Sequence, residues 1–540
     1  MLVYTERSLY SIQLTGAHVF DEHNGLKVEW LGSRGNSSQK EPDSRRFISR
    51  YDPSSRYYTL SGFGLTSETP LLRQWREFDD ESYTAKIDVT IPFTADGEDG
   101  SFLKTGLYHD YQQRDFSQVE FSYQRGIPPP LVPGARLDYQ AEGNESFQEV
   151  FFKLPENIGK VQPEDLVDDY IAFGLDPATA QLFADIFAET AMYWFAFSVD
   201  SPFGEYDADQ LLTAGYLMAN IKPSEWLEVV AGARIEMTDL TARSRAPDEA
   251  FGEGSIFPFN PGRIQQLDVL PALVVTAEPA KAMNIRLAYS QTVARPTFRE
   301  FAPVVTRDLI EGEIFRGNPE LVMSRIDSFD FRWEWFPRRG DMAGIGVFYK
   351  RITDPIEYAS NADFVFFEQS EEGRVYGIEM EARKRLDDVG GALGGWDWLR
   401  HMEVALNAAL LSSEVRKSDR LIRQQELAGS GLPTTRQLQG QPGYTANASI
   451  AYDNTDTGTF LGAFYNITGP YLYRAGADPL TPDVFQQPVP QLDFTLSQRF
   501  GEHWKVTLRA KNMLDPRSEK TYNYDGVEEY YEHYRKGREY

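Results

Sequence analysis

Hydrophobic and polar residues alternate with a period of two along much of the chain. In residues 227–238 every odd-numbered position is apolar, and every even-numbered position except Val230 is polar or small. The same alternation occurs in residues 82–91, 283–293, 328–335 and 504–511. Successive side chains of a β-strand point to opposite faces of the sheet, so this pattern predicts strands with one apolar and one polar face.

These alternating segments are long. Strands of globular proteins usually have about 5–6 residues, whereas these patterns persist for about 10–15 residues, enough for a tilted strand to cross a bilayer with some overhang. The polar face carries full charges, such as Arg286, Arg332 and Glu334, and must therefore meet water. A soluble sandwich with its apolar face in the core also satisfies this pattern. The connections between the strands therefore have to distinguish a membrane barrel from a soluble sandwich.

Short and long connections alternate in order along the chain. Tight polar turns are predicted at residues 222–225, 278–282, 338–341, 454–458 and 501–503, and long irregular loops at residues 125–205, 244–263, 298–324, 417–441 and 477–489. An up-and-down barrel with short turns at one end and long loops at the other produces this order, whereas Greek-key sandwiches do not. Trp226, Phe336 and Trp504 lie beside short turns, where an interfacial aromatic girdle is expected.

The sequence therefore predicts an all-β fold, a transmembrane antiparallel β-barrel with long extracellular loops and about 16–17 strands present. One loop, residues 125–205, is expected to contain a short helix at residues 177–197, because Asp176 is a suitable N-cap before Pro177. That helix either covers the mouth as part of a lid or packs on the barrel rim.

Composition excludes several classes of function. The 540 residues include 54 basic and 81 acidic side chains, a net charge of −27, and no cysteine. Sequence-independent nucleic-acid binding is disfavoured because it needs Lys and Arg to neutralise phosphates. We attribute the negative charge to solvated loops and turns rather than to cation capture. Without cysteine there is neither a disulfide framework nor a thiolate metal site.

The chain lacks a recognisable catalytic constellation. Its six histidines have no metal-ligand spacing, and the nucleophile-elbow, phosphate-loop and dinucleotide motifs are absent. The acidic turns at residues 96–100 and 453–456 are interpreted as solvated turns in preference to loose calcium sites. We therefore expect no enzymatic activity, no cofactor and no resident metal.

Eight strings of residues follow one another in a characteristic order: SQTVARPTFREFAP (290–303), GNPEL (317–321), GVFYKRITDPI (346–356), VYGIEMEARKRL (375–386), LQGQPGY (438–444), FYNITG (464–469), PQLDFTLSQ (490–498) and AKNMLD (510–515). Together they resemble the barrel portion of TonB-dependent outer-membrane receptors of Gram-negative bacteria. We interpret Pro296, Pro319 and Pro355 as structural, because proline cannot donate to a strand ladder and interrupts pairing.

The resemblance implies a receptor in the outer membrane that binds a scarce solute, such as an oligosaccharide or a siderophore, and imports it with energy from the TonB–ExbB–ExbD system. Such receptors carry a signal peptide, a TonB-engaging segment and a plug inside a barrel of roughly 22 strands. Residues 1–10 already have a strand pattern, and residues 534–540 resemble the start of a closing strand. Residues 1–540 are therefore expected to be a partial barrel domain without a plug.

The resemblance places solute binding on the long loops. Aromatic rings stack on sugar faces or chelate rings, and arginine pairs with carboxylates. The candidate ligand-binding residues are Tyr193, Trp194, Phe257, Arg316, Arg420 and Arg423. The expected partners are the TonB system, an extracellular small solute and outer-membrane lipid, with no nucleic acid. A slight preference for a carbohydrate or other organic ligand rests on analogy alone.

Two other functions are compatible with parts of the pattern. A passive porin-like channel needs no plug and admits small solutes without selectivity. A soluble all-β carbohydrate-binding protein hides its apolar face internally and needs no detergent, although the repeat of about 40–50 residues typical of propellers is absent.

Overall fold

The computed structural model describes residues 2–23, 25–47, 49–52, 57–60, 71–94, 100–124, 196–198, 204–245, 260–308, 313–361, 364–392, 396–429, 431–478, 481–524 and 527–540. No helix in these ranges is long and apolar enough to cross a membrane.

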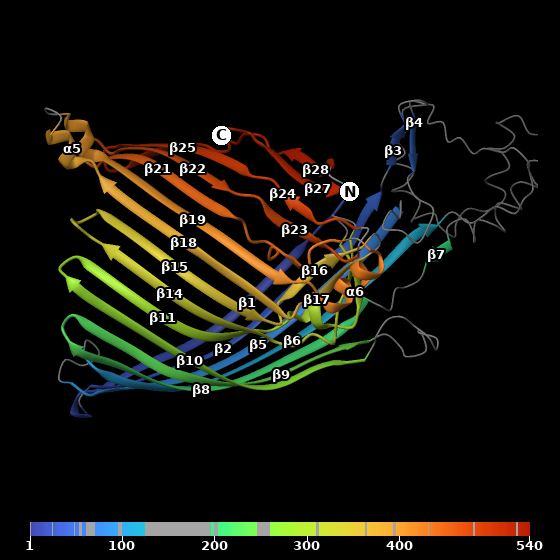
Figure 1. The fold of residues 1–540 in the computed structure, drawn as a ribbon, viewed down its shortest axis with the longest axis horizontal. Helices are drawn as coiled ribbons and strands as arrows, with labels where there is room; N and C mark the ends of the chain where they lie inside the picture. Colours follow the sequence, from blue (N-terminus) through green and yellow to red (C-terminus); the bar gives the residue numbers. More distant parts are fainter. Residues whose placement is uncertain are drawn as a thin grey trace, which may run out of the picture.

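One large sheet forms the wall of the molecule, and Figure 1 shows its strands running obliquely side by side. Each long strand is antiparallel to the next along the chain: β1 (Glu6–Phe20), β2 (Leu26–Phe47), β5 (Leu71–Pro92), β6 (Phe102–Gln124), β8 (Tyr206–Ser224), β9 (Leu227–Ser244), β10 (Gly262–Ala280), β11 (Met283–Ala294), β14 (Ser324–Trp335), β15 (Met342–Thr353), β18 (Glu372–Arg385), β19 (Met402–Arg416), β21 (Tyr444–Asn454), β22 (Thr459–Thr468), β25 (Val489–Phe500) and β26 (Trp504–Ala510).

The predicted fold class and strand number are confirmed. The main sheet has 18 strands within the described ranges, including the short β7 (Ala196–Ser198) and β20 (Thr435–Arg436), which leaves sixteen long wall strands. In those ranges β1 pairs in this sheet with β2, and β26 with β25, so these two strands are its edges.

Strands near the N-terminus are longer than predicted. β5 and β6 have 22 and 23 residues, whereas the sequence pattern predicted about 10–15. The apolar outward positions of β5 extend from Ile91 to Tyr83, and beyond them the outward residues are Glu81, Asp79 and Glu77. Hydrogen bonding between the strands continues past the apolar band, but the alternation of apolar and polar residues does not. The prediction therefore stopped where the outer face becomes polar.

The two faces of the wall are chemically distinct. Outward Leu107 and Leu267 are 65% and 66% exposed, whereas inward Asp88 and Glu236 are 4% and 8% exposed. Apolar side chains on the outer face of this wall are stable in contact with acyl chains, and the polar side chains of the inner face meet an aqueous interior.

Aromatic side chains border the apolar band at both ends. On the loop side, the rings of Tyr289 and Phe329 lie 4.9 Å apart and those of Phe329 and Tyr349 lie 6.4 Å apart, on three neighbouring strands. At the other end, the exposed residues beside tight turns are Trp226, Phe336 and Trp504. This is the arrangement expected of interfacial girdles.

One connection at the turn end is longer than the others. Residues between β18 and β19 form helix α5 (Asp387–Ala392) and the 3₁₀ helix η5 (Asp397–His401), visible at the end opposite the long loops in Figure 1. The remaining described elements outside the wall and the mouth are η1 (Asp21–His23) and the hairpin of β3 (Ser49–Asp52) and β4 (Tyr57–Leu60).

The loops at the mouth are more ordered than predicted. They contain helices α4 (Phe298–Phe301) and α6 (Asp419–Leu427). A second sheet joins β12 (Val305–Arg307), β13 (Ile314–Arg316), β17 (Val365–Gln369), β16 (Ile356–Ser360), β23 (Tyr471–Gly476), β24 (Val484–Gln486), β27 (Arg517–Tyr524) and β28 (Val527–Arg535). The predicted helix at residues 177–197 lies outside the described ranges except for Ala196 and Phe197. Those two residues are in strand β7, where pairing with β6 takes precedence over local helical propensity.

Candidate functional site at the barrel mouth

The loop that contains α4 is packed against the inner face of the wall. Phe301 and Ala302 are fully buried together with Leu240 and Ala242 of β9, which are on the same face as the inward Glu236. Thr297 and Glu300 form a capping box that fixes the start of α4. This loop therefore narrows the mouth from within.

A hairpin bridges wall strands that are not neighbours. β16 follows β15 and pairs in parallel with β23, which follows β22, through Ala359↔Ala475 and Ser360↔Gly476. In the wall, β15 and β22 are separated by β18, β19 and β21. On its other side, β17 pairs in parallel with β13. We call α4, α6, β12, β13, β16, β17, β20, β23 and β24 the mouth shelf; of these, Figure 1 labels α6, β16, β17, β23 and β24, which lie toward the loop end of the wall.

Side chains from the family-like strings hold the mouth shelf together. Gln439 accepts from the Tyr358 amide at 2.8 Å and donates to the Tyr473 carbonyl at 2.8 Å. Asn318 donates from Nδ2 to the Phe367 carbonyl at 3.0 Å. These contacts join β16 to β23 and the α4 loop to β17. The strings GNPEL and LQGQPGY thus have structural roles here.

A buried ion pair lies at the centre of the mouth shelf. Arg436 of β20 and Glu357 of β16 are 3.1 Å apart, with side chains 4% and 1% exposed. Glu357 also accepts from Ser370 Oγ at 3.0 Å, and Arg436 donates to the Gly476 carbonyl at 3.3 Å. Burial lowers the pKa of the nearby Lys417, and Arg436 lowers it further while Asp483 opposes the shift. The ion pair and its hydrogen bonds thus fix β16, β20 and the end of β23 relative to one another.

Three of the predicted ligand-binding residues lie in the described ranges, and all three are on the mouth shelf. Arg420 of α6 donates to Glu368 at 3.0 Å and lies over the Phe366 ring, 5.4 Å from its centroid. Arg423 is exposed on the same helix. Arg316 ends β13, and burial lowers its pKa. Tyr193, Trp194 and Phe257 lie outside the described residues, so the predicted set is only partly located.

Arg299 was not among the ligand-binding residues predicted from the sequence. Its guanidinium lies 3.9 Å from the centre of the Phe315 ring, a cation–π geometry. Burial lowers its pKa, and Asp308 opposes this shift. Arg299 belongs to the string SQTVARPTFREFAP, in which only Pro296 was given a structural interpretation. The pairing with Phe315 depends on a tertiary contact and leaves no signature in the sequence.

Below the mouth, one part of the inner wall is lined by paired charges. Glu236 accepts from Arg234 at 2.6 Å and also binds Arg295, which donates to Thr238 at 3.0 Å. Elsewhere on this wall, Arg114 and Asp80 form two hydrogen bonds of 2.6 Å. Such bidentate, partly enclosed pairs orient both side chains.

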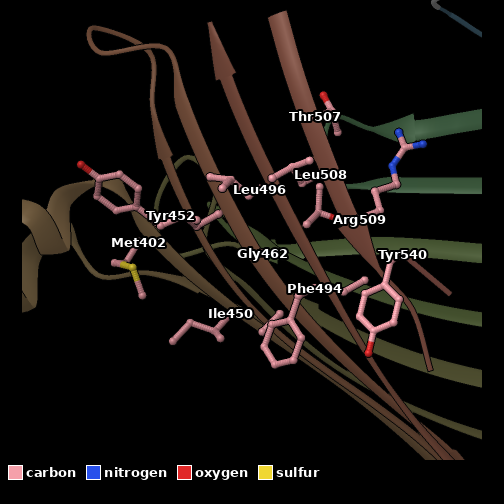
Figure 2. Close-up of a pocket in the computed structure, with 14 residues that line it drawn as sticks. Met402, Ile450, Tyr452, Gly462, Phe494, Leu496, Thr507, Leu508, Arg509 and Tyr540 are labelled. Carbon is pink, nitrogen blue, oxygen red and sulfur yellow. The ribbon is translucent and has the colours of Figure 1, made fainter. Parts of the chain in front are cut away.

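The described part of the wall contains hollows on both of its faces. A hollow of about 740 Å³, shown in Figure 2, is bordered by Ile450, Leu461, Phe494, Leu496, Leu508 and Tyr540, largely on the outer apolar face. It therefore opens toward lipid and is not a solute site. A smaller hollow of about 280 Å³ in the inner wall is lined by Arg286, Asp330, Arg332, Lys350 and Glu379.

No group of three or more His, Asp or Glu side chains suited to hold a metal ion occurs in the described part of the chain. In the acidic turn at residues 453–456, Asn454 accepts from the amides of Asp456 and Thr457 at 3.0 and 3.1 Å. A side-chain turn of this kind explains the local sequence without a cation.

Comparisons with known protein families and solved structures agree with a β-barrel architecture. A family model described as TonB dependent receptor-like, beta-barrel matches residues 23–513. No curated protein matches the sequence.

Solved structures show the same fold at low sequence identity. The ferric yersiniabactin uptake receptor FyuA from Yersinia pestis has a TM-score of 0.55 and 11% identity, over 97% of this chain and 59% of that one. The ferric citrate transporter FecA has a TM-score of 0.55 and 10% identity, over 98% and 60%. The ferric-catecholate import receptor Fiu from E. coli K12 has a TM-score of 0.53 and 11% identity, over 96% and 61%.

This chain thus spans about three fifths of the length of these receptors. Barrels of the matching family are transport proteins of the Gram-negative outer membrane and not enzymes, in agreement with the localisation and class predicted from the sequence. With the family model matched over most of its residues, the chain belongs to the TonB dependent receptor-like, beta-barrel family.

Proposed function

We propose that this chain supplies the wall and mouth of an outer-membrane receptor that imports a scarce solute with energy from the TonB–ExbB–ExbD system. The observation that carries the proposal is the parallel pairing of β16 with β23. This pairing joins the hairpin that follows β15 to the strand that follows β22, across the three wall strands between them, and so narrows the entrance of the barrel. A passive porin conducts through an open lumen, so a braced and narrowed mouth favours a receptor.

The domain assignment is part of the same proposal. Residues 1–540 form one barrel domain, and the plug and the TonB-contacting segment come from outside these residues. The solved receptors are longer than this chain, which gives room for such parts. The proposed solute is an oligosaccharide, a siderophore or a similar organic ligand. FyuA, FecA and Fiu are receptors or transporters of ferric chelates, but identities near one tenth support only a shared fold.

Uptake in whole cells tests the proposal. Cells carrying the complete receptor gene are compared with otherwise identical cells lacking TonB, for accumulation of labelled oligosaccharides and labelled ferric citrate. We expect accumulation of at least one probe to require both the receptor and TonB. Entry that requires the receptor but persists without TonB or without a proton-motive force would establish a passive channel instead.

The located arginines are tested in the same assay. Arg316→Ala and Arg423→Ala remove the candidate ligand contacts, and Arg420→Ala removes a side chain already paired with Glu368. If the mouth shelf contacts the solute, the first two changes reduce uptake at a low probe concentration without lowering receptor abundance. Unchanged uptake in both variants removes these residues from the site.

A further inference from the structure

Four amide side chains form a continuous row across four wall strands. Asn407 of β19 lies opposite Asn447 of β21, Asn447 opposite Asn466 of β22, and Asn466 opposite Gln491 of β25. Residues directly opposite in an antiparallel pair lie on the same face. We call these four residues the amide row.

The amide row faces the lumen. On the same strands the residues of opposite parity, such as Leu406, Ile450 and Leu496, are exposed apolar side chains of the outer face. Asn407 and Asn447 alternate with these positions and therefore lie on the inner face. Asn466 and Gln491 lie on the inner face as well, because Asn466 is paired opposite Asn447 and Gln491 opposite Asn466.

Hydrogen bonds run along the row in one direction. Asn466 donates from Nδ2 to Asn447 Oδ1, and Asn447 donates to Asn407 Oδ1 at 2.7 Å. Within the described part of the chain, Asn407 Nδ2 and Asn466 Oδ1 have no hydrogen-bond partner. Gln491 donates to Asp493 at 3.2 Å. A donor therefore remains available at Asn407 and an acceptor at Asn466. These residues lie on β19 and β22, which are separated by β21, so each can bond a different hydroxyl group of one ligand.

An aromatic ring lies beside the row on the same face. Phe464 lies opposite Ser449 and Asp493 and is 40% exposed, although it faces the lumen. A Cβ placed on Gly462 would be 2.7 Å from the Phe464 ring and 3.2 Å from the Phe460 ring, so both rings lie over this glycine along the wall. Phe464 therefore presents an exposed apolar surface beside amides, the combination that fits the CH face and the hydroxyls of a sugar ring.

The four residues of the row are uncharged, and both of its ends adjoin carboxylates. Asn407 lies opposite Glu381 of β18, which is paired with Arg332 at 3.0 Å. At the other end, Asp493 accepts from Gln491 and from the Asn512 amide at 2.8 Å. An anionic chelate would be recognised by Arg or Lys, whereas a neutral polyol needs donors, acceptors and a stacking surface. We propose that the amide row and Phe464 form a lumen site for a neutral oligosaccharide. This inference rests on the proposed function and specifies its solute class.

A purely structural role for the row, in which the amides only join neighbouring strands, makes a different prediction. Under that role a substitution lowers stability and leaves solute affinity unchanged. The test must therefore measure affinity and stability separately.

The experiment uses outer membranes that contain the complete receptor. Equilibrium binding is measured with three labelled probes, maltohexaose, xylohexaose and mannohexaose, and with ferric citrate as the anionic comparison. We expect at least one hexasaccharide to bind, and Asn447→Ala and Phe464→Ala each to weaken its affinity about tenfold or more. Asn447→Asp keeps the side-chain shape and serves as the second variant if Asn447→Ala does not assemble.

Gln266→Ala provides a matched control. Gln266 faces the lumen from β10 and donates to Asp268, two residues further along, at 2.9 Å, as Gln491 does to Asp493. Its replacement should leave hexasaccharide affinity unchanged. If hexasaccharide affinity falls equally in the control and in the row variants, the assignment of the site is overturned. Unchanged affinity in every row variant would also overturn it.

The two proposals fail in distinguishable ways. If no hexasaccharide binds but ferric citrate enters in a TonB-dependent manner, the amide row is not a sugar site and the receptor function stands. If a hexasaccharide binds at the row but enters cells without TonB, the lumen site stands and the energy-coupled function fails.

Discussion

Two regions of the inner wall use polar side chains in opposite ways. On β5, β6 and β9 the inward residues are charged and paired, as in Asp80 with Arg114 and Glu236 with Arg234. On β19, β21, β22 and β25 four of the inward residues are neutral amides in one row. Both regions face the same lumen, so exposure to water alone does not explain the difference.

The comparison distinguishes polar side chains whose hydrogen-bonding capacity is already used from side chains that can still bind a solute. Glu236 receives hydrogen bonds from two arginines and is 8% exposed, which leaves little capacity for a solute. Asn407 and Asn466 are exposed and keep a donor and an acceptor unused within the described residues. We infer that the charged region stabilises the wall and that the neutral region is the better surface for recognition.

The largest expected effect comes from the ion pair of the mouth shelf. Glu357→Ala should reduce the free energy of unfolding by about 3–5 kcal/mol, because it leaves Arg436 buried without its carboxylate. Thermal unfolding in detergent measures the loss. The double variant Glu357→Met with Arg436→Met should recover most of it. A small loss in the single variant would show that charge pairing is not what fixes this region.

A smaller loss is expected within the charged wall. Glu236→Ala removes the common partner of Arg234 and Arg295 and should cost about 1.5–3 kcal/mol. Asn447→Ala in the amide row should cost about 0.5–1.5 kcal/mol, because neutral hydrogen bonds at an exposed site contribute less. Denaturant unfolding of the two variants compares the regions directly. Equal losses would contradict the division into a stabilising and a recognising wall.

Ionic strength sharpens the same comparison through binding. Affinity for a neutral hexasaccharide at the amide row should change less than about twofold between roughly 0.05 M and 0.5 M salt, because uncharged groups are not screened. Affinity for an anionic chelate held by arginines should fall over that range. Titrations at both salt concentrations measure this. A steep salt dependence for the sugar would indicate charged contacts outside the row.

A further effect concerns Asp341, in the turn between β14 and β15. Burial raises its pKa, but hydrogen bonds from the Arg385 amide, Arg338 and Lys384 outweigh it and lower the pKa to about 2. Because the folded pKa lies below the unfolded value of about 3.9, this stabilisation is present above about pH 4 and is lost as the pH falls through about 2.

Asp341→Asn should therefore lower stability by about 1 kcal/mol at neutral pH. The difference from the parent protein should stay constant from about pH 8 to pH 5 and disappear near pH 2. Thermal unfolding across this pH range checks the prediction, and a difference that persists at the lowest pH would contradict it.

Much of the wall could be predicted from the sequence. The alternation at residues 227–238 identified both the strand and its outward face, because a period of two has a direct geometric meaning. The order of short and long connections gave the up-and-down topology. Strand ends were underestimated where outward residues such as Asp79 are polar, since hydrogen bonding between strands does not require an apolar face.

The mouth could be predicted only in part. Arg316, Arg420 and Arg423 were selected by residue type and do lie on one shelf, but the pairing of Arg420 with Glu368 connects residues 52 positions apart. The cation–π contact of Arg299 and the ion pair of Arg436 with Glu357 are likewise long-range. Local sequence patterns do not contain this information.

By itself the sequence determined where alternating wall strands lie, which face of those segments meets lipid, and the family to which the chain is similar, but not the full length of each strand. These properties depend on residues one or two positions apart and on the hydrophobic effect, so they can be inferred from the order of residues in the chain. Tertiary structure alone decided that the hairpin β16–β17 bridges distant strands and that four amides share one register. Register between strands is a relation among segments far apart in the chain, so only the assembled sheet fixes it.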